Sequence, residues 1–324
     1  MIKTPFFTIS LDFELLWGIF SEASLETYGA NILGGRNSIP KILSLFKSYK
    51  IHATWGVVAM ASFENKKELM NFLPDIKPNY VNYNVDPYRY LNNVGENESE
   101  DPYHFGYSLL RQITDVEGME IGSHTFSHFY CLEEHNEGAF KADLEAASAS
   151  FERLDIDTKS LIFCRNQYSE KHLNVARDAG FTAYRGNEDH YLHRPRRKHA
   201  LPVRAARLAD AYVNISGNHL STPNATLKGL VNIPSSRFLR PTLNNKYLEN
   251  LRLNRIKSSM LAAAQKNKGF HLWWHPHNFG KDPLENIGFL TNILTYYEFL
   301  SGKYGMQSLS MSEISAGIIE SGGN

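Results

Sequence analysis

The chain of 324 residues is long enough for one large α/β domain or for two domains of average size. Lysine plus arginine and aspartate plus glutamate both number 34, so there is no basic excess of the kind that attracts nucleic acid or anionic lipid. Cys131 and Cys164 are the only two cysteines, which argues against a disulfide framework and fits a reducing compartment.

The sequence also bears on membrane insertion and export. No apolar run reaches the roughly 18 residues that a membrane span requires. The apolar N-terminus meets Asp12 and Glu14 at once and lacks a small-residue cleavage site, so we expect a strand there rather than a signal peptide. These features predict a soluble, cytoplasmic protein without a membrane span.

Short apolar runs alternate with longer stretches of helical periodicity along most of the chain. We expect strands over residues 5–13, 51–60, 119–124, 160–164, 181–186, 230–235, 270–277 and 306–311. We expect helices over residues 38–49, 105–115, 140–154, 169–180, 245–269 and 284–305. Repeated strand-then-helix units predict parallel strands with right-handed crossovers. About seven or eight such units favour a barrel over an open doubly wound sheet.

Two insertions interrupt this rhythm. Residues 75–105 are rich in Asn, Tyr, Pro and acidic residues, and residues 187–228 carry the basic cluster HRPRRKH. Long loops inside a compact domain are usually either functional or disordered. We expect both to be lids over one mouth of a single barrel domain, residues 1–324. The basic cluster is either a solvated loop or a candidate for contacting a phosphate group, and Arg237 and Arg240 are candidates for the same contact.

Polar residues stand at the ends of four predicted strands. They are Asp12 and Glu14, then His124 and His128, then Arg165 to Tyr168, and last His275 to Asn278. Since α/β enzymes place their sites at the carboxyl ends of parallel strands, these side chains are expected to converge.

The first two of these groups suggest a metal site. Asp12 and Glu14 are two residues apart and share one face of a strand, and His124 and His128 share a face if the turn after their strand is helical. One carboxylate and two imidazoles are a common ligand set for catalytic zinc, and the other carboxylate is then free to act as general base. The alternatives are that the acids cap a helix and that the histidines lie on a helix surface.

The ordered set SLDFE, SHTFSH, CRNQY and LWWHPH resembles the motifs of the NodB-homology polysaccharide deacetylases, carbohydrate esterase family 4. HTFSH matches the family's second motif, His-Ser/Thr-x-x-His, in full. The first motif, Thr-Phe-Asp-Asp-Gly in the family, has the Asp-Phe-Glu spacing of a divergent branch. The third, Arg-x-Pro-Tyr, keeps Arg165 and Tyr168 but has Gln167 in place of proline.

The resemblance implies a fold and a metal site. The fold is a distorted (β/α) barrel of about seven parallel strands, NodB-like. Glu14, His124 and His128 would hold a divalent metal, with zinc as the expected ion, and Asp12 would be the general base. The Asp-Phe-Glu spacing leaves open an exchange of the roles of Asp12 and Glu14.

The resemblance also implies the remaining catalytic groups. Arg165 would orient the base, the backbone N–H of Tyr168 would help hold the oxyanion, and His275 would protonate the departing amine. Rivals for the acid are His271 and His277. Asp210 and Asn214 are the candidates for supporting His275, and Arg165 also has a structural alternative as an ion-pair partner.

The function implied is that of a metal-dependent hydrolase removing the N-acetyl group from a sugar or polysaccharide precursor. The substrate would be a carbohydrate, nucleotide- or lipid-linked, in surface-polysaccharide or O-antigen lipopolysaccharide biosynthesis. The alternatives are a deformylase or cyclic-amide hydrolase on the same barrel, and an inactive barrel that binds glycans.

Overall fold

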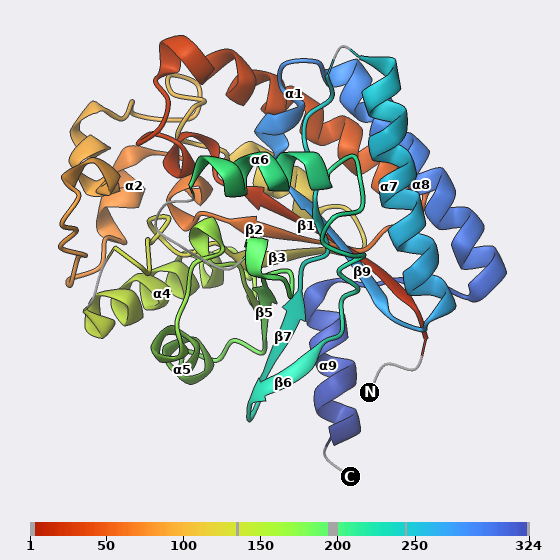
Figure 1. The fold of residues 1–324 in the computed structure, drawn as a ribbon. Helices are drawn as coiled ribbons and strands as arrows, with labels where there is room; N and C mark the ends of the chain where they lie inside the picture. Colours follow the sequence, from red (N-terminus) through yellow and green to blue (C-terminus); the bar gives the residue numbers. More distant parts are fainter. Residues whose placement is uncertain (1–3, 134–135, 194–199, 244, 323–324) are drawn as a thin grey trace.

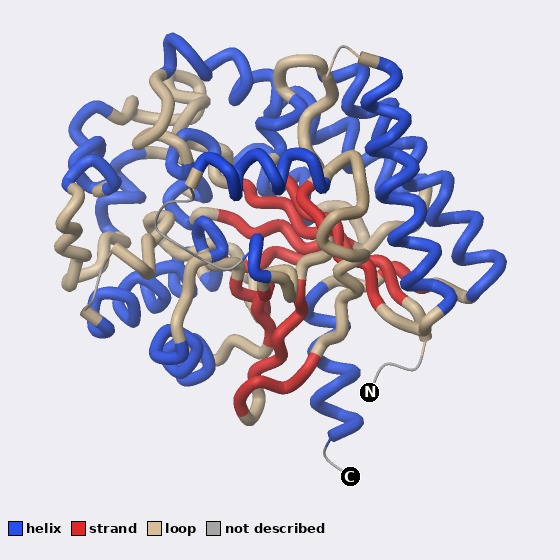
Figure 2. The backbone as a smooth tube through the Cα atoms, in the orientation of Figure 1, coloured by secondary structure: helices blue, strands red, loops and turns tan. Residues whose placement is uncertain are grey.

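A curled, mostly parallel sheet forms the centre of the computed structural model (Figures 1 and 2), which describes residues 4–133, 136–193, 200–243 and 245–322. The strand order is β6-β7-β5-β4-β3-β2-β1-β9-β8, and β10 also pairs with β1. The strands are β1 (Phe6–Phe13), β2 (Ala53–Val57), β3 (Met119–Ser123), β4 (Ser160–Leu161), β5 (Ala183–Gly186), β6 (Asn224–Leu227), β7 (Leu230–Pro234), β8 (Arg237–Phe238), β9 (Gly269–Trp274) and β10 (Gln307–Ser308).

The segment that joins β7 to β8 connects the two sides of this sheet. β7 pairs with β5, whereas β8 pairs with β9 at the other end of the strand order. Between them, the N–H of Ser235 donates to Gly186 O and the N–H of Ser236 donates to His271 O, each at 2.8 Å. The predicted α/β class and the distorted barrel are therefore confirmed, with β6 antiparallel to β7.

β1 shows why the sequence forms a strand buried on both faces. Phe7, Ile9 and Leu11 belong to the main hydrophobic core, together with residues from the covering helices. Ser10 and Asp12 alternate onto the opposite face, and both are buried. The first strand thus turns an apolar face outward to the helices and a polar face toward the barrel interior.

Helices surround the sheet (Figure 1). They are α1 (Leu25–Ser48), α2 (Lys66–Asn71), α3 (Tyr107–Thr114), α4 (Glu137–Glu152), α5 (Glu170–Asp178), α6 (Leu201–Asp210), α7 (Lys246–Gln265), α8 (Pro283–Tyr304) and α9 (Met311–Gly322). Every helix expected from the sequence is present, whereas α2, α6 and α9 were not expected. Across the described ranges, no helix is both long enough and apolar enough to cross a membrane.

Helix α1 begins at Leu25, well before the expected start at residue 38. The side chain of Ser24 accepts the N–H of Thr27 and caps the helix. Gly34 and Gly35 lie inside it, where an added Cβ would stand 2.1 Å from Gly280 O and 2.6 Å from His277 Cα. These glycines therefore allow α1 to pack directly against the turn η7 (Pro276–Phe279) that follows β9.

Both insertions contain ordered structure. Residues 75–105 include two short 3₁₀ helices, η3 (Tyr83–Val85) and η4 (Pro87–Asn93). The hydroxyl of Tyr80 accepts the N–H of Tyr130 at 3.1 Å, which ties this insertion to the loop after β3. Residues 187–228 include α6 and β6, and residues 194–199 of the basic cluster lie outside the described ranges. The lid role of both insertions stays a prediction.

Candidate active site

Glu14 and two histidines meet at one point inside the barrel mouth. Oε2 of Glu14 lies 3.2 Å from Nε2 of His128 and 3.5 Å from Nε2 of His124. All three side chains are buried. The other ring nitrogen of His124, Nδ1, donates to the carbonyl of Ile162 at 2.8 Å, so the lone pair of its imidazole lies on Nε2 and faces the carboxylate.

An irregular loop, rather than a helical turn, brings the two histidines together. Thr125 and His128 have φ values of 66° and 58°, in the left-handed region. The carboxylate of Asp143 in α4 accepts the N–H of Phe126 at 2.7 Å and the hydroxyl of Ser127. These contacts fix the HTFSH loop against α4 and hold both imidazoles toward Glu14.

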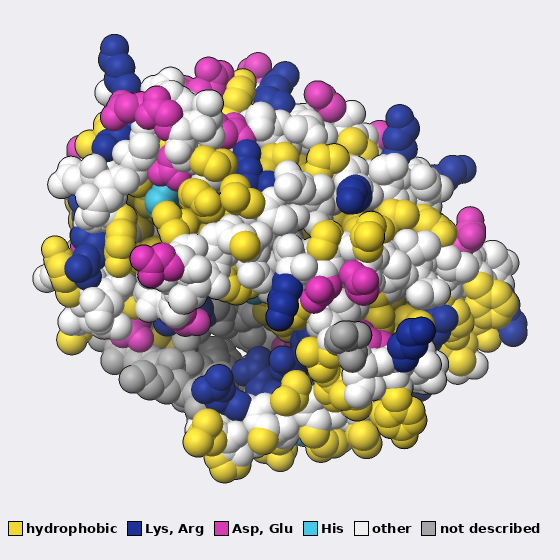
Figure 3. Space-filling model, turned by 90° about the horizontal axis from the view of Figure 1, so that it is seen from above, with side chains coloured by type: hydrophobic (Ala, Val, Ile, Leu, Met, Phe, Trp, Pro, Cys, Tyr) yellow, Lys and Arg dark blue, Asp and Glu magenta, His cyan; other side chains and the backbone are white. Residues whose placement is uncertain are grey.

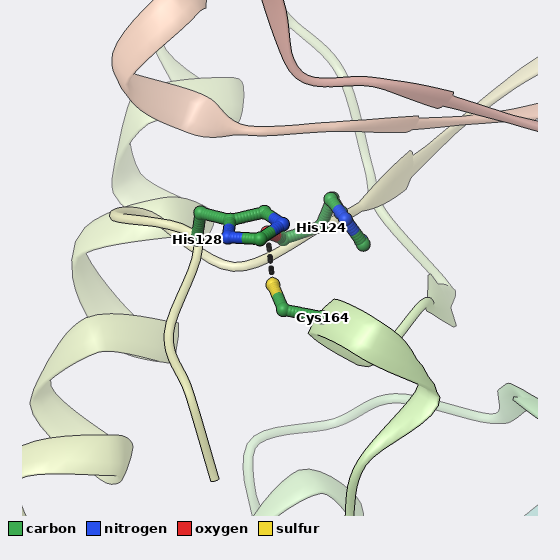
Figure 4. A group of neighbouring side chains, drawn as sticks. All are labelled: His124, His128 and Cys164. Atoms are coloured by element: carbon green, nitrogen blue, oxygen red, sulfur yellow. Dashed lines mark hydrogen bonds between the residues drawn. The ribbon is translucent and has the colours of Figure 1, made fainter. Parts of the chain in front are cut away.

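Cys164 is the site residue that the sequence interpretation missed, because no other cysteine stands near it in the sequence to indicate a metal site. Its Sγ and one nitrogen each of His124 and His128 all lie within 4.8 Å of one another (Figure 4). Sγ also lies 3.5 Å from the carbonyl oxygen of His124. Burial would raise the pKa of this thiol, but the imidazoles of His124 and His128 lower it to about 6.

The buried groups at this point require a positive charge. Burial would lower the pKa of His124, but the Cys164 thiolate and Glu14 raise it to about 10. Burial would raise the pKa of Glu14, but His275, His124 and His128 hold that pKa well below its ordinary value. Nε2 of His124 has no hydrogen-bond partner among the described residues. Without a metal, protons on the imidazoles would supply this positive charge. A divalent cation would replace those protons, because one carboxylate and two deprotonated imidazoles are a common ligand set.

Asp12 is held by an arginine from a different strand. Arg185, in β5, donates to both carboxylate oxygens of Asp12, at 2.6 and 2.7 Å. The guanidinium also donates to Ser10 Oγ and to Asn166 Oδ1, and it lies over the ring of Trp273. Burial would raise the pKa of Asp12, but Arg185 lowers it below its usual value. Asp12 is therefore an oriented carboxylate at neutral pH.

This geometry corrects the expected contact between Arg165 and Asp12. Arg165 has φ 54° and points the other way, donating to Glu22 Oε1 at 2.8 Å and lying over the ring of Tyr130. The contacts of Arg165 therefore agree with the alternative interpretation, in which this arginine is a structural ion-pair partner. Arg185 makes the contact that the motif assigned to Arg165.

Three histidines at and after β9 have separate environments. His271 is buried and its Nε2 lies 2.8 Å from Ser10 Oγ, and His277 is buried and stacked on His275 at 4.9 Å. Nε2 of His275 lies 3.6 Å from Asp12 Oδ2 and 3.7 Å from Glu14 Oε1. Of the three, His275 is the one that reaches both carboxylates while keeping part of its side chain exposed.

The expected supports of His275 lie elsewhere. Asp210 holds Arg237, and Asn214 accepts the N–H of Gly217. Instead, Oδ1 of Asn278 accepts the N–H of His275 at 3.2 Å and lies 3.4 Å from its ring Nδ1. The turn η7 therefore orients the imidazole from the side opposite the carboxylates.

Tyr168 has its ring packed against Phe163 and Tyr184 in a separate hydrophobic cluster. Burial raises the pKa of its hydroxyl, so the phenol is neutral. The role expected for its backbone N–H remains a prediction.

Gly18 makes room for the Glu14 carboxylate. A Cβ at Gly18 would stand 2.0 Å from Glu14 Cδ. Because the side chain of Glu14 would have to move away, Gly18→Ala is expected, if Glu14 is a metal ligand, to lower the affinity for a divalent metal by about tenfold or more, as loss of a supporting contact to a ligand does. Calorimetric titration with zinc measures this. Gly288→Ala in α8, where an added Cβ meets nothing within 4 Å, is the control, and equal affinities of the two variants would contradict the expectation.

The polysaccharide deacetylase family model matches residues 28–184. The matched range contains His124, His128, Cys164, Arg165 and Tyr168, and it leaves Asp12, Glu14 and His275 outside. No curated protein matches this chain.

Solved structures of similar fold include proteins assigned as polysaccharide deacetylases. One is from Mycobacterium smegmatis, with a TM-score of 0.60, 11% identity, and coverage of 96% of this chain and 90% of that one. Another is from Pseudomonas aeruginosa PAO1, with a TM-score of 0.56, 11% identity, and coverage of 96% and 89%. The Puue allantoinase has a TM-score of 0.55 and 12% identity, with coverage of 96% and 88%. At these identities the likeness establishes the fold.

Proposed function

We propose, on the premise that this chain is a member of the polysaccharide deacetylase family through residues 28–184, that it is a metal-dependent hydrolase removing the N-acetyl group from a sugar. The observation that carries the proposal is the meeting of Glu14 with His124 and His128, beside an Asp12 carboxylate fixed by Arg185. Nε2 of His275 lies within 3.7 Å of an oxygen of each carboxylate.

Glu14, His124 and His128 would hold the divalent metal, with zinc as the proposed ion. A divalent ion supplies a bound water of lowered pKa and polarises the acyl oxygen of the substrate. The contacts support Glu14 as the metal ligand and Asp12 as the base. Glu14 contacts both imidazoles, whereas Asp12 is paired with Arg185.

Asp12 would take the proton of the attacking water. The carboxylate is ionised at neutral pH because Arg185 lowers its pKa, and the two-point contact fixes its direction. His275 would then donate a proton from Nε2 to the departing amine. The ring is suited to this because Asn278 holds its Nδ1 side. We propose the backbone N–H of Tyr168 as a donor to the developing oxyanion.

The proposed substrate is an N-acetylated sugar or polysaccharide precursor in surface-polysaccharide or O-antigen assembly, in the cytoplasm. The test is acetate release from N-acetylated oligosaccharides and nucleotide sugars by the zinc-loaded protein. Release of formate from N-formyl sugars, or opening of a cyclic amide, without acetate release would favour the alternative hydrolases. Binding of glycans with no turnover by a fully metal-loaded protein would favour an inactive barrel.

Cys164 offers a test of the donor set that does not depend on turnover. Because its sulfur lies close to both histidines, the cobalt-substituted protein is expected to show a thiolate-to-cobalt charge-transfer band in the near ultraviolet. Cys164→Ser should remove the band and weaken zinc binding, since thiolate is a strong zinc ligand. The control is Cys131→Ser, at the other buried cysteine. A cobalt protein without this band would restrict the donors to Glu14 and the histidines.

A further inference from the structure

A second polar pocket lies beside His275, over the open end of the barrel. Its volume is about 250 Å³, and its lining includes His275, Trp273 and Phe238 from the barrel side. The second insertion supplies the opposite wall, including His193 and Asp210. Since one water needs only about 10–15 Å³ of cavity, this space admits a chemical group as large as a phosphate next to the proposed acid.

Arg237 is the feature of this pocket that calls for a ligand. The side chain is 7% exposed, and its Nη1 donates to the backbone carbonyl of Asp210 at 3.1 Å and to Oδ2 at 3.3 Å. Its Nε and Nη2 are buried without a hydrogen-bond partner in the described part of the chain. Buried charged donors left unsatisfied are costly, so a native structure normally supplies an acceptor for them.

Two further arginines line the same space. Arg207 and Arg240 border this pocket and also the adjacent, more open one that contains Arg204. Figure 3 shows Lys and Arg side chains gathered beside a hollow on this face. Two acids line the pocket with them. Asp210 already accepts two backbone N–H groups besides the Arg237 contact, and Oε2 of Glu188 lies 3.7 Å from Nδ1 of His193. The pocket therefore presents cationic donors to a ligand.

We propose that this pocket is an anion-binding subsite, which holds a carboxylate or phosphate group of the sugar substrate while the N-acetyl group lies between His275 and the metal site. This rests on the proposed function and specifies its substrate class as an acidic or phosphorylated sugar. Arg237 supplies the buried donors, Arg240 and Arg207 supply charge, and the ring of Trp273 offers an apolar face to the sugar.

A cation site made from the same residues fits less well. His193, Asp210 and His219 bring ligand atoms within 4.8 Å of one another. However, the Asp210 carboxylate is engaged by Arg237, and Oδ1 lies 3.8 Å from Arg255 Nη2. Guanidinium groups this close to the cluster oppose a second metal ion. The imidazole of His193, whose two ring nitrogens have no hydrogen-bond partner among the residues described, remains available to a sugar hydroxyl, whereas Nε2 of His219 lies 2.6 Å from Ser216 Oγ.

The test measures kcat/KM for an N-acetylated oligosaccharide that carries a uronate or a phosphate and for its neutral counterpart. The ratio of the two values is then compared between the wild-type protein and its variants. Losing a hydrogen bond to a charged group corresponds to about tenfold. Arg237→Gln is therefore expected to lower this ratio by about tenfold or more, and Arg240→Gln, which leaves the Asp210 contact intact, should lower it as well. Arg177→Gln on the exposed surface of α5 should leave the ratio unchanged. A ratio unaltered by both pocket substitutions would overturn the proposal.

Binding to the metal-free protein separates this inference from the proposed function. Calorimetric titration with glucuronate and with inorganic phosphate is expected to show binding that weakens in Arg237→Gln, and it distinguishes a carboxylate from a phosphate source. If such binding appears and no deacetylation occurs on any substrate, the subsite stands and the proposed function fails. Deacetylation by a protein that binds neither anion would contradict the subsite. A second tightly bound metal that is lost in Asp210→Asn would contradict it as well.

Discussion

Replacing His124 with alanine is expected to remove the bound metal and to lower kcat/KM for deacetylation on the order of 10³-fold. The reason is geometric, because Nε2 of His124 is buried 3.5 Å from the Glu14 carboxylate and has no hydrogen-bond partner within the described ranges. Metal content by plasma emission and acetate release, measured on the same preparation, give both readouts.

The matched control is His52→Ala. This histidine pairs with Glu313, and its side chain is 37% exposed. The control should retain one equivalent of metal and normal turnover. A His124→Ala protein that keeps its metal and its activity would show that the metal site has been assigned to the wrong residues.

Arg185→Ala is expected to lower kcat by about 10²-fold or more, with folding weakened by roughly 3–5 kcal/mol, because Asp12 would be left as a buried, uncompensated charge. Arg185 holds the pKa of Asp12 below its usual value. Removing the guanidinium therefore raises that pKa, and the acidic limb of the kcat profile should move to higher pH. Denaturant unfolding and the pH profile measure the two effects.

Arg165→Ala tests the competing assignment. Its guanidinium contacts Glu22 and Tyr130 at the surface of the site, so activity should fall by less than about tenfold, with the acidic limb unchanged, since exposed ion pairs contribute little. Arg185→Lys should recover only part of the activity that Arg185→Ala loses, because an ammonium keeps the positive charge but cannot reproduce the two-point contact with Asp12. If Arg165→Ala moved the acidic limb and Arg185→Ala did not, the roles would have to be reversed.

The stability of the wild-type protein should depend on pH through the same pair. Asp12 has a folded-state pKa below its ordinary value, so its pairing with Arg185 contributes stability at pH values above the unfolded-state pKa. That contribution is lost as the pH falls through the depressed folded-state pKa. Arg185→Ala should lack this contribution, which urea unfolding over an acidic pH series would reveal.

Much of the fold could be predicted because the strands have simple patterns. In β1, apolar Phe7, Ile9 and Leu11 alternate with polar Ser10 and Asp12, and the structure places the two sets on opposite faces. The start of α1 could not be predicted as easily. Gly34 and Gly35 weaken the helical pattern in the sequence. Glycine is needed at these positions because α1 packs closely against Gly280 and His277, which are far away in the sequence.

The metal ligands could be proposed from ordered motifs, whereas the partner of Asp12 could not. The motif indicated Arg165, but that side chain pairs with Glu22 and lies over the ring of Tyr130. The available signal was Arg185 itself, an arginine within the apolar strand sequence FTAYRG, where a buried charge requires a partner. Its partner lies 173 positions earlier in the chain, and no local pattern identifies such a pair.

We propose that Glu14, His124 and His128 hold one divalent ion on which deacetylation depends. The most direct measurement is acetate release from N-acetylated oligosaccharides by chelator-stripped protein as zinc is titrated back. We predict that release rises from background and saturates at one equivalent of zinc in the wild-type protein, with no such rise in Glu14→Gln. Full acetate release without metal, or an equal rise in the Glu14 variant, would contradict the account.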